Sequence, residues 1–141
     1  MIIFSELKEC FYDFGRIEIK AFDKRLFCEE IGILIAQVHI TQTEKYAEIT
    51  IFCVKEKYRN QKIGTALVKQ LFEYAKIQGM SYISVTPGPC DQYNEGMELT
   101  NETQIEIYKK MKFVFPQPKS VYQLLETGVS EKDKEGILKI M

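Results

Sequence analysis

A polar turn between two apolar segments carries the residues best suited to hold a phosphate group. Over residues 55–64 it reads Lys-Glu-Lys-Tyr-Arg-Asn-Gln-Lys-Ile-Gly. It follows an apolar run and precedes an amphipathic one, so we expect it to join a strand to the start of a helix. The first N–H groups of a helix have no intrahelical partner and lie at the positive end of its dipole. The turn therefore predicts a phosphate site, aided by Arg59.

Two elements must position that turn. Residues 47–54 are rich in β-branched and apolar side chains, with Glu48 as the one charge, and this predicts a strand. Residues 63–78 repeat apolar side chains at helical spacing, with polar and charged side chains opposite, and this predicts an amphipathic helix. Gly79 is expected to end the helix.

The turn resembles the acetyl-coenzyme A motif of the GNAT superfamily of N-acetyltransferases, Arg/Gln-x-x-Gly-x-Gly/Ala. Arg59 and Gly64 match this motif, whereas Lys62 stands where the first glycine of the family usually is. The preceding strand resembles that of the histone-acetylating members. Glu48 lies at the place of their general base, with the same spacing to the turn.

A second motif follows on the next predicted helix. GNAT proteins often carry Asn-x-x-Ala-x-x-x-Tyr-x-x-x-Gly-Phe there, and Asn101, Tyr108 and Phe113 match it. Two other motif positions depart from the pattern, Gln104 and Lys112. The resemblance implies that Asn101 contacts the cofactor arm and that Tyr108 lies near the thioester sulfur as general acid.

The resemblance implies transfer of an acetyl group from acetyl-CoA to a primary amine by direct attack. Such a transfer needs a base for the amine, donors for the developing oxyanion and a proton for the leaving thiolate. Glu48 is the candidate base and Tyr108 the candidate acid. A strand amide near Cys53 or Val54 is the candidate oxyanion donor. The residues expected to contact the cofactor are Phe52, Cys53, Val54, Arg59, Asn60, Gln61, Lys62, Ile63, Gly64, Thr65, Asn101 and Tyr108.

Each candidate also has a purely structural alternative. Glu48 would face solvent on an amphipathic strand, Tyr108 would be a core aromatic residue, and Cys53 would be a small buried side chain. Cys90 has no histidine placed to activate it, and His39 is expected to be a strand residue. The four cysteines include no Cys-x-x-Cys pair, so no metal site is expected.

The composition is that of one folded domain. The chain has 141 residues, is 45% hydrophobic and contains nine phenylalanines and eight tyrosines, enough for a core. Its net charge of −1 argues against nucleic acid as the main partner. There is no apolar run of membrane-spanning length and no export signal at the start, so we expect a reduced, cytoplasmic protein without a membrane partner.

The whole pattern predicts an α+β (α/β) fold of the GNAT type over residues 1–141. We expect a mixed, mostly antiparallel central sheet flanked by helices, with a right-handed β-α-β cofactor-binding unit whose strands are parallel or splayed. A bulge is expected at Gly32. The expected strands are residues 16–22, 30–41, 47–54, 81–86, 112–115 and 120–127. Two peripheral segments are expected, 1–15 with a helical face of Leu7, Phe11 and Phe14, and a charged, helical 128–141.

The acceptor stays open at this point. Small molecules and peptides are both candidates, and a homodimer through the last strands is a further alternative. The loop of residues 87–100 carries Asp91, Tyr93, Glu95, Met97 and Glu98 and is either a wall for a cationic amine or a solvated insertion. The alternative to an enzyme is a GNAT-fold protein that binds acyl-CoA or regulates with little turnover, because lysines occupy two usual glycine positions.

Overall fold

The computed structural model describes residues 2–4, 8–10, 15–25, 28–88, 92–93, 95, 99–116 and 135–140. They form a mixed sheet with the strand order β1-β3-β4-β5-β6-β7, and β2 also pairs with β3. The strands are β1 (Ile2–Phe4), β2 (Lys8–Cys10), β3 (Arg16–Asp23), β4 (Glu29–Ile40), β5 (Lys45–Val54), β6 (Tyr82–Val85) and β7 (Gly136–Lys139). All neighbours are antiparallel except β5 and β6, which confirms the predicted mixed, mostly antiparallel sheet.

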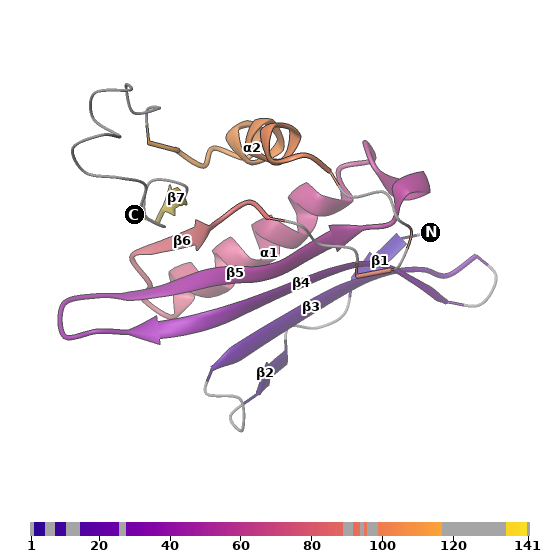
Figure 1. Cartoon of the computed structure of the whole chain (residues 1–141). Helices are drawn as coiled ribbons and strands as arrows, with labels where there is room; N and C mark the ends of the chain where they lie inside the picture. Colours follow the sequence, from indigo (N-terminus) through magenta and orange to yellow (C-terminus); the bar gives the residue numbers. More distant parts are fainter. Residues whose placement is uncertain are drawn as a thin grey trace, which may run out of the picture.

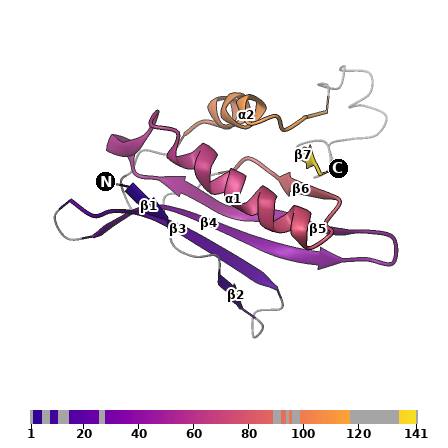
Figure 2. The ribbon, with the colours of Figure 1, turned by 180° about the vertical axis from the view of Figure 1, so that it is seen from behind.

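One long helix covers one face of the sheet. This helix, α1 (Ile63–Ile77), lies behind the strands in Figure 1 and in front of them in Figure 2. Its apolar stripe packs against the inward residues of β3, such as Ile17 and Ile19, which are fully buried. A second helix, α2 (Asn101–Lys110), lies on the side of β6 (Figure 1). The main core therefore lies between α1 and the sheet.

The opposite face of the sheet, which we call the second face, has a smaller apolar cluster. Ile33, Ile35 and Cys53 are buried there, and Tyr93 packs on them from the loop before α2. Because strand side chains alternate, His39 and Glu48 also lie on this face. The two faces thus differ in chemistry, one apolar and the other mixed.

A bulge in β5 decides which of its residues lie on the second face. The register of β5 against β4 shifts at Thr50, whose hydroxyl donates to the carbonyl of Ile35 at 3.2 Å. A bulge interrupts the alternation of side chains. Glu48 and Cys53, an odd number of residues apart, therefore share the second face, while Phe52 packs against the α1 core.

Pairing between β5 and β6 ends well before β5 does. The last paired residues are Ile49 and Val85, and β5 then continues to Val54 without β6 beside it. This confirms the predicted β-α-β unit with strands that part. The opening leaves the edge of β5 from Thr50 onward without a β6 partner.

Several local predictions were wrong. The bulge expected at Gly32 lies one residue earlier, where Ile31 is skipped in the pairing with β3. The expected strand 112–115 is reduced to a bridge between Val114 and Ile137. Residues 136–139 form β7 instead of a helix. Pairing with β6 gives the backbone groups at this sheet edge hydrogen-bond partners, and this outweighs the weak helix propensity of the segment. The predicted helical face of Leu7, Phe11 and Phe14 and the predicted strand 120–127 lie outside the described residues.

Both lysines at the usual glycine positions have the left-handed backbone that glycine adopts easily. Lys62 has φ 62° and Lys112 has φ 78°. Left-handed backbone costs about 1–2 kcal/mol per residue for side chains other than glycine, because Cβ approaches the following carbonyl oxygen. The turns keep the conformation that a glycine would favour, although the residue type has changed.

We predict that Lys112→Gly raises the free energy of unfolding by about 0.5–1 kcal/mol, since relief of the strained φ exceeds the entropy that glycine gains in the unfolded chain. Lys69→Gly is the matched control, because Lys69 is exposed within α1 and should lose about 1 kcal/mol. Urea unfolding of the three proteins measures both changes. A loss of stability in Lys112→Gly would contradict the assigned backbone strain.

Candidate functional site

A cavity of about 610 Å³ lies where β5 ends, between the start of α1 and the inner side of α2. Most of the residues predicted to contact a cofactor line it: Phe52, Cys53, Val54, Arg59, Asn60, Lys62, Ile63, Gly64, Thr65 and Tyr108. Three predicted site residues do not line it: Glu48, Gln61 and Asn101. The structure thus gathers the turn, the strand end and the second helix around one space.

The start of α1 lines this cavity with residues whose backbone N–H groups have no acceptor within the helix. The first intrahelical bond runs from the N–H of Ala66 to the carbonyl of Lys62 at 3.0 Å. The amides of residues 63–65 precede it, so they are the N–H groups that a helix leaves for another acceptor. Lys62 is exposed and precedes the helix with its left-handed backbone. This arrangement suits an anionic ligand.

Gly64 is required at the first turn of α1 by a close aromatic neighbour. A Cβ added there would lie 2.9 Å from Cζ of Phe52 and 3.7 Å from Cε of Met111. The Phe52 ring can therefore lie against the helix start only because no side chain is present. Gly64 thus lies between the apolar side of the cavity, which includes Phe52, and the polar turn of residues 59–62.

Arg59 ties the turn to the end of β5. Its Nε donates to the carbonyl of Val54 at 2.9 Å. A guanidinium has five N–H donors in a planar fork, so this single bond does not exhaust its capacity. Arg59 can therefore fix the turn and still present positive charge to the cavity that it lines.

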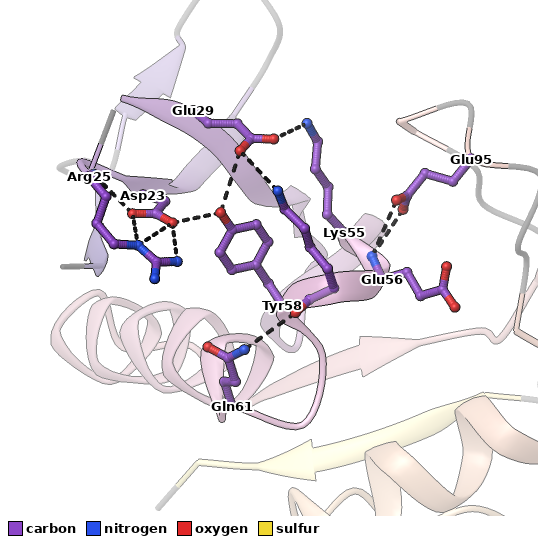
Figure 3. A network of polar contacts seen from close by, with 9 residues as sticks. Asp23, Arg25, Glu29, Lys55, Glu56, Tyr58, Gln61 and Glu95 are labelled. Carbon is purple, nitrogen blue, oxygen red and sulfur yellow. Dashed lines mark hydrogen bonds and ion pairs between the residues drawn. The ribbon is translucent and has the colours of Figure 1, made fainter. Parts of the chain in front are cut away.

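A polar network holds the short helix η2 (Glu56–Tyr58), which immediately precedes Arg59. Figure 3 shows the Tyr58 side chain reaching toward Asp23, and its hydroxyl donates to Oδ2 of Asp23 at 2.6 Å. Arg25 donates to both carboxylate oxygens of Asp23, with Nη2 to Oδ2 at 2.6 Å. These bonds, those from Arg25 first, hold the pKa of Asp23 well below its usual range.

Two more carboxylates complete this network (Figure 3). Lys55 binds Oε1 of Glu29 at 3.0 Å, and this hydrogen bond is the main cause of a lowered pKa of Glu29. Oε1 of Glu95 accepts from the backbone N–H of Glu56 at 3.1 Å. Residues 55–58, which precede the predicted phosphate-binding turn of residues 59–64, are thus held from two sides. One side is the connection between β3 and β4, and the other is the loop before α2. The sequence did not predict these contacts, because the partners are far apart along the chain.

Tyr108 closes the apolar end of the cavity. It is buried, and its ring lies 5.9 Å from that of Phe52 and 5.4 Å from that of Phe113. The sequence analysis offered a core aromatic residue as the structural alternative for Tyr108, and the burial of its ring agrees with that alternative. It also lines the cavity, so the two interpretations are compatible at this position.

The residue just before α2 caps the start of this helix. Thr100 is the N-cap, and its hydroxyl accepts from the N–H of Thr103 at 3.2 Å. The side chain of Gln104 donates to the carbonyls of Gly88 and Leu99. The longer Gln side chain reaches the loop, whereas Asn101 becomes the first helical residue and is exposed.

Glu48 lies on the second face and has a partner that the sequence analysis missed. Its Oε1 is 3.0 Å from Nε2 of His39 on β4, and both side chains are partly exposed. Across on β6 it pairs in register with Ser84, whose buried Oγ has no hydrogen-bond partner among the described residues. The turn at residues 41–44 is the sequence signal that could have predicted this pair. A hairpin closed by that turn places residue 39 opposite residue 46 and diagonally next to residue 48.

The described residues contain no group of three or more His, Cys, Asp or Glu that could hold a metal ion. Nor is any helix among them long and apolar enough to cross a membrane. Cys53 is buried, in agreement with its structural alternative from the sequence, and it also lines the cavity. Cys90, Asp91, Met97 and Glu98 lie outside the described residues.

Comparison with known proteins decides the family. The family model for the acetyltransferase (GNAT) family matches residues 3–113, which is most of the chain. This protein belongs to the GNAT acetyltransferase family. The mixed sheet with its two helices is the GNAT fold, and acyl-CoA use is a property of this family. No curated protein matches the sequence.

Solved structures of GNAT proteins share the fold. An aminoglycoside acetyltransferase from an uncultured soil metagenomic sample is 25% identical, with a TM-score of 0.53 over 74% of this chain and 66% of that one. The NatC complex bound to Gag peptide and CoA is 17% identical, with a TM-score of 0.61 over 88% of this chain and 71% of that one.

A third similar structure is much longer than this GNAT chain. It contains the GCN5-related glucosamine N-acetyltransferase region of a fungal multidomain GH3 β-N-acetylglucosaminidase, at 15% identity and a TM-score of 0.59. The match covers 73% of this chain but only 12% of that one. The chain thus spans less than two thirds of that protein and of the soil acetyltransferase.

We predict that Asp23→Asn lowers the Tm most above about pH 4. A carboxyl whose pKa is lowered by folding stabilises the fold above its unfolded pKa, near 3.9, and loses this effect as pH falls through the folded pKa. The Tm difference from wild type should therefore shrink between about pH 4 and pH 2. Differential scanning fluorimetry across pH measures it, with exposed Glu73→Gln on α1 as control. A difference that is constant with pH would argue against the network.

Proposed function

We propose that this GNAT protein transfers the acetyl group of acetyl-CoA to a primary amine by direct attack. The observation that carries the proposal is the parting of β5 from β6 after Ile49 and Val85, beside the helix start. The cavity lies beside this parting, and Glu48 lies just before it, where β5 still pairs with β6, on the second face. Such an arrangement suits two substrates that approach from opposite faces.

In this proposal the amides of residues 63–65 and the guanidinium of Arg59 hold the diphosphate of the cofactor. Asn60, Gln61 and Asn101 contact its outer parts, and the exposed ammonium of Lys62 adds charge near the phosphates. The edge of β5 around Phe52, Cys53 and Val54 meets the pantetheine arm, since strand amides without a β6 partner are donors for its amide groups. The lining of the cavity by the turn and by β5 supports this placement.

The proposed chemistry divides the proton steps between two residues. Glu48 accepts a proton from the ammonium of the acceptor, so that the amine nitrogen gains a lone pair and forms the new C–N bond. A strand amide near Cys53 or Val54 donates to the oxyanion as the C–S bond weakens. The hydroxyl of Tyr108 protonates the leaving thiolate of CoA, and it regains a proton through solvent as the nitrogen that has attacked releases its second proton. Supporting this division, Tyr108 lines the cavity while Glu48 lies on the second face.

We predict that acetyl-CoA at 100 times its Kd stabilises the protein by about 2.7 kcal/mol, whereas adenosine does not, because only the former has the diphosphate and pantetheine. Gly64→Ala should weaken binding about tenfold, or about 1.4 kcal/mol, since its Cβ crowds Phe52. Gly88→Ala is the matched control, because its Cβ would meet nothing within 4 Å. Thermal shift and calorimetry measure both effects. Absence of any stabilisation by acetyl-CoA would refute cofactor binding.

We predict that Glu48→Gln and Tyr108→Phe each lower kcat by about 10²–10⁴-fold, because each variant keeps its shape and loses its proton. The measurement is thiol release with panels of polyamines, aminoglycosides and peptides. Glu73→Gln, a charge-matched change on the exposed side of α1, should keep full rate. A protein that binds acetyl-CoA but releases no thiol with any amine would be a binding module instead of an enzyme.

A further inference from the structure

His39 is the single histidine of the chain and contacts the candidate base directly. Its Nε2 lies 3.0 Å from Oε1 of Glu48, within hydrogen-bond distance. The side chains of His39 and Glu48 are 38% and 42% exposed, so both also reach solvent. The pair therefore connects the place of the proposed attack to bulk water through an imidazole.

Aromatic stacking fixes the plane of this imidazole. The His39 ring stacks on Tyr46 at 4.9 Å, and Tyr46 stacks on Tyr82 at 4.6 Å. The rings come from adjacent positions on β4, β5 and β6, and the hydroxyl of Tyr82 donates to Glu44 at 3.2 Å. A ring held in this way can turn little, so its Nε2 stays directed at Glu48.

The other ionisable groups around the pair are not placed to exchange its proton at neutral pH. Burial, then the nearby carboxylates, raises the pKa of Tyr46, and burial with the Glu44 contact raises the pKa of Tyr82 to about 12. On β3, the Glu18 carboxylate on the second face is ion-paired with Arg16 and Lys20. Histidine is the side chain that ordinarily gains and loses a proton between pH 5 and 8.

We propose that His39 is a positioning residue that orients Glu48 and receives its proton. This rests on the proposed acetyl transfer. The acceptor ammonium gives its proton to the Glu48 carboxylate, which passes it to Nε2 of His39. The imidazolium then releases a proton from Nδ1 to solvent, which leaves the Nε2–H tautomer, and exchange with solvent moves this proton back to Nδ1. Glu48 and His39 have then both returned to their starting forms. His39 touches no reacting atom and acts only through Glu48.

The test compares two substitutions at His39 by steady-state kinetics. His39→Gln keeps a polar donor near Glu48 but cannot take up a proton, and it should lower kcat about tenfold. The KM for acetyl-CoA should not change, because the cofactor cavity does not include His39. His39→Ala should lose a similar factor, and added imidazole should restore part of kcat, which a merely structural residue would not allow. Full kcat in His39→Gln, or no rescue of His39→Ala, overturns the inference.

A second measurement is independent of turnover. Because the chain has one histidine, its imidazole ¹⁵N signals are assigned without ambiguity. Glu48→Gln should shift the Nε2 signal, whereas Glu18→Gln, another change on the second face, should not. An unchanged Nε2 signal in Glu48→Gln refutes the contact.

The outcomes separate the two proposals. If wild type binds acetyl-CoA and turns over while His39→Gln keeps full kcat, only the role of His39 fails. If wild type neither binds acetyl-CoA nor releases thiol, the proposed acetyl transfer fails, and the role of His39 fails with it.

Discussion

The parting of β5 from β6 is the constraint on which the rest of this structure depends. After Ile49 and Val85 the two parallel strands no longer pair, although β5 continues to Val54. The bulge at Thr50 lies next to this point and redirects the side chains that follow. An intact ladder here would close the sheet and separate its two faces. The cavity and the edge of β5 without a β6 partner both lie at this parting.

The phosphate turn illustrates how a motif can change in residue type and keep its conformation. Lys62 stands at a usual glycine position and has the left-handed backbone that glycine would adopt there. Its side chain is exposed, and the residues of the first helical turn that follow it line the cavity. The network of Asp23, Tyr58 and Arg25 holds the preceding segment, so the turn is supported from the β3–β4 hairpin. Strain at one residue is thus offset by contacts made elsewhere.

The two faces of the sheet divide the chemistry that the GNAT family requires. The α1 side provides backbone donors, Arg59 and the apolar surroundings of Tyr108 around one cavity. The second face provides Glu48, which contacts His39 beside a stack of aromatic rings. The Glu48 carboxylate on the second face is partly exposed to solvent, whereas Tyr108 on the α1 side is buried. In the proposed mechanism, this division places the proton-accepting side chains of Glu48 and His39 in contact with solvent.

The sequence by itself determined the local elements and the family. Periodicity located the strand with Glu48 and helix α1, and the matching Arg59, Gly64 and Tyr108 predicted a GNAT fold and a phosphate turn. The tertiary structure alone decided the bulge at Thr50, the strand β7 and the pairing of Glu48 with His39. The physical reason is that periodicity reports only neighbours along the chain. Register, sheet-edge pairing and hydrogen bonds across strands depend on residues that only folding brings together.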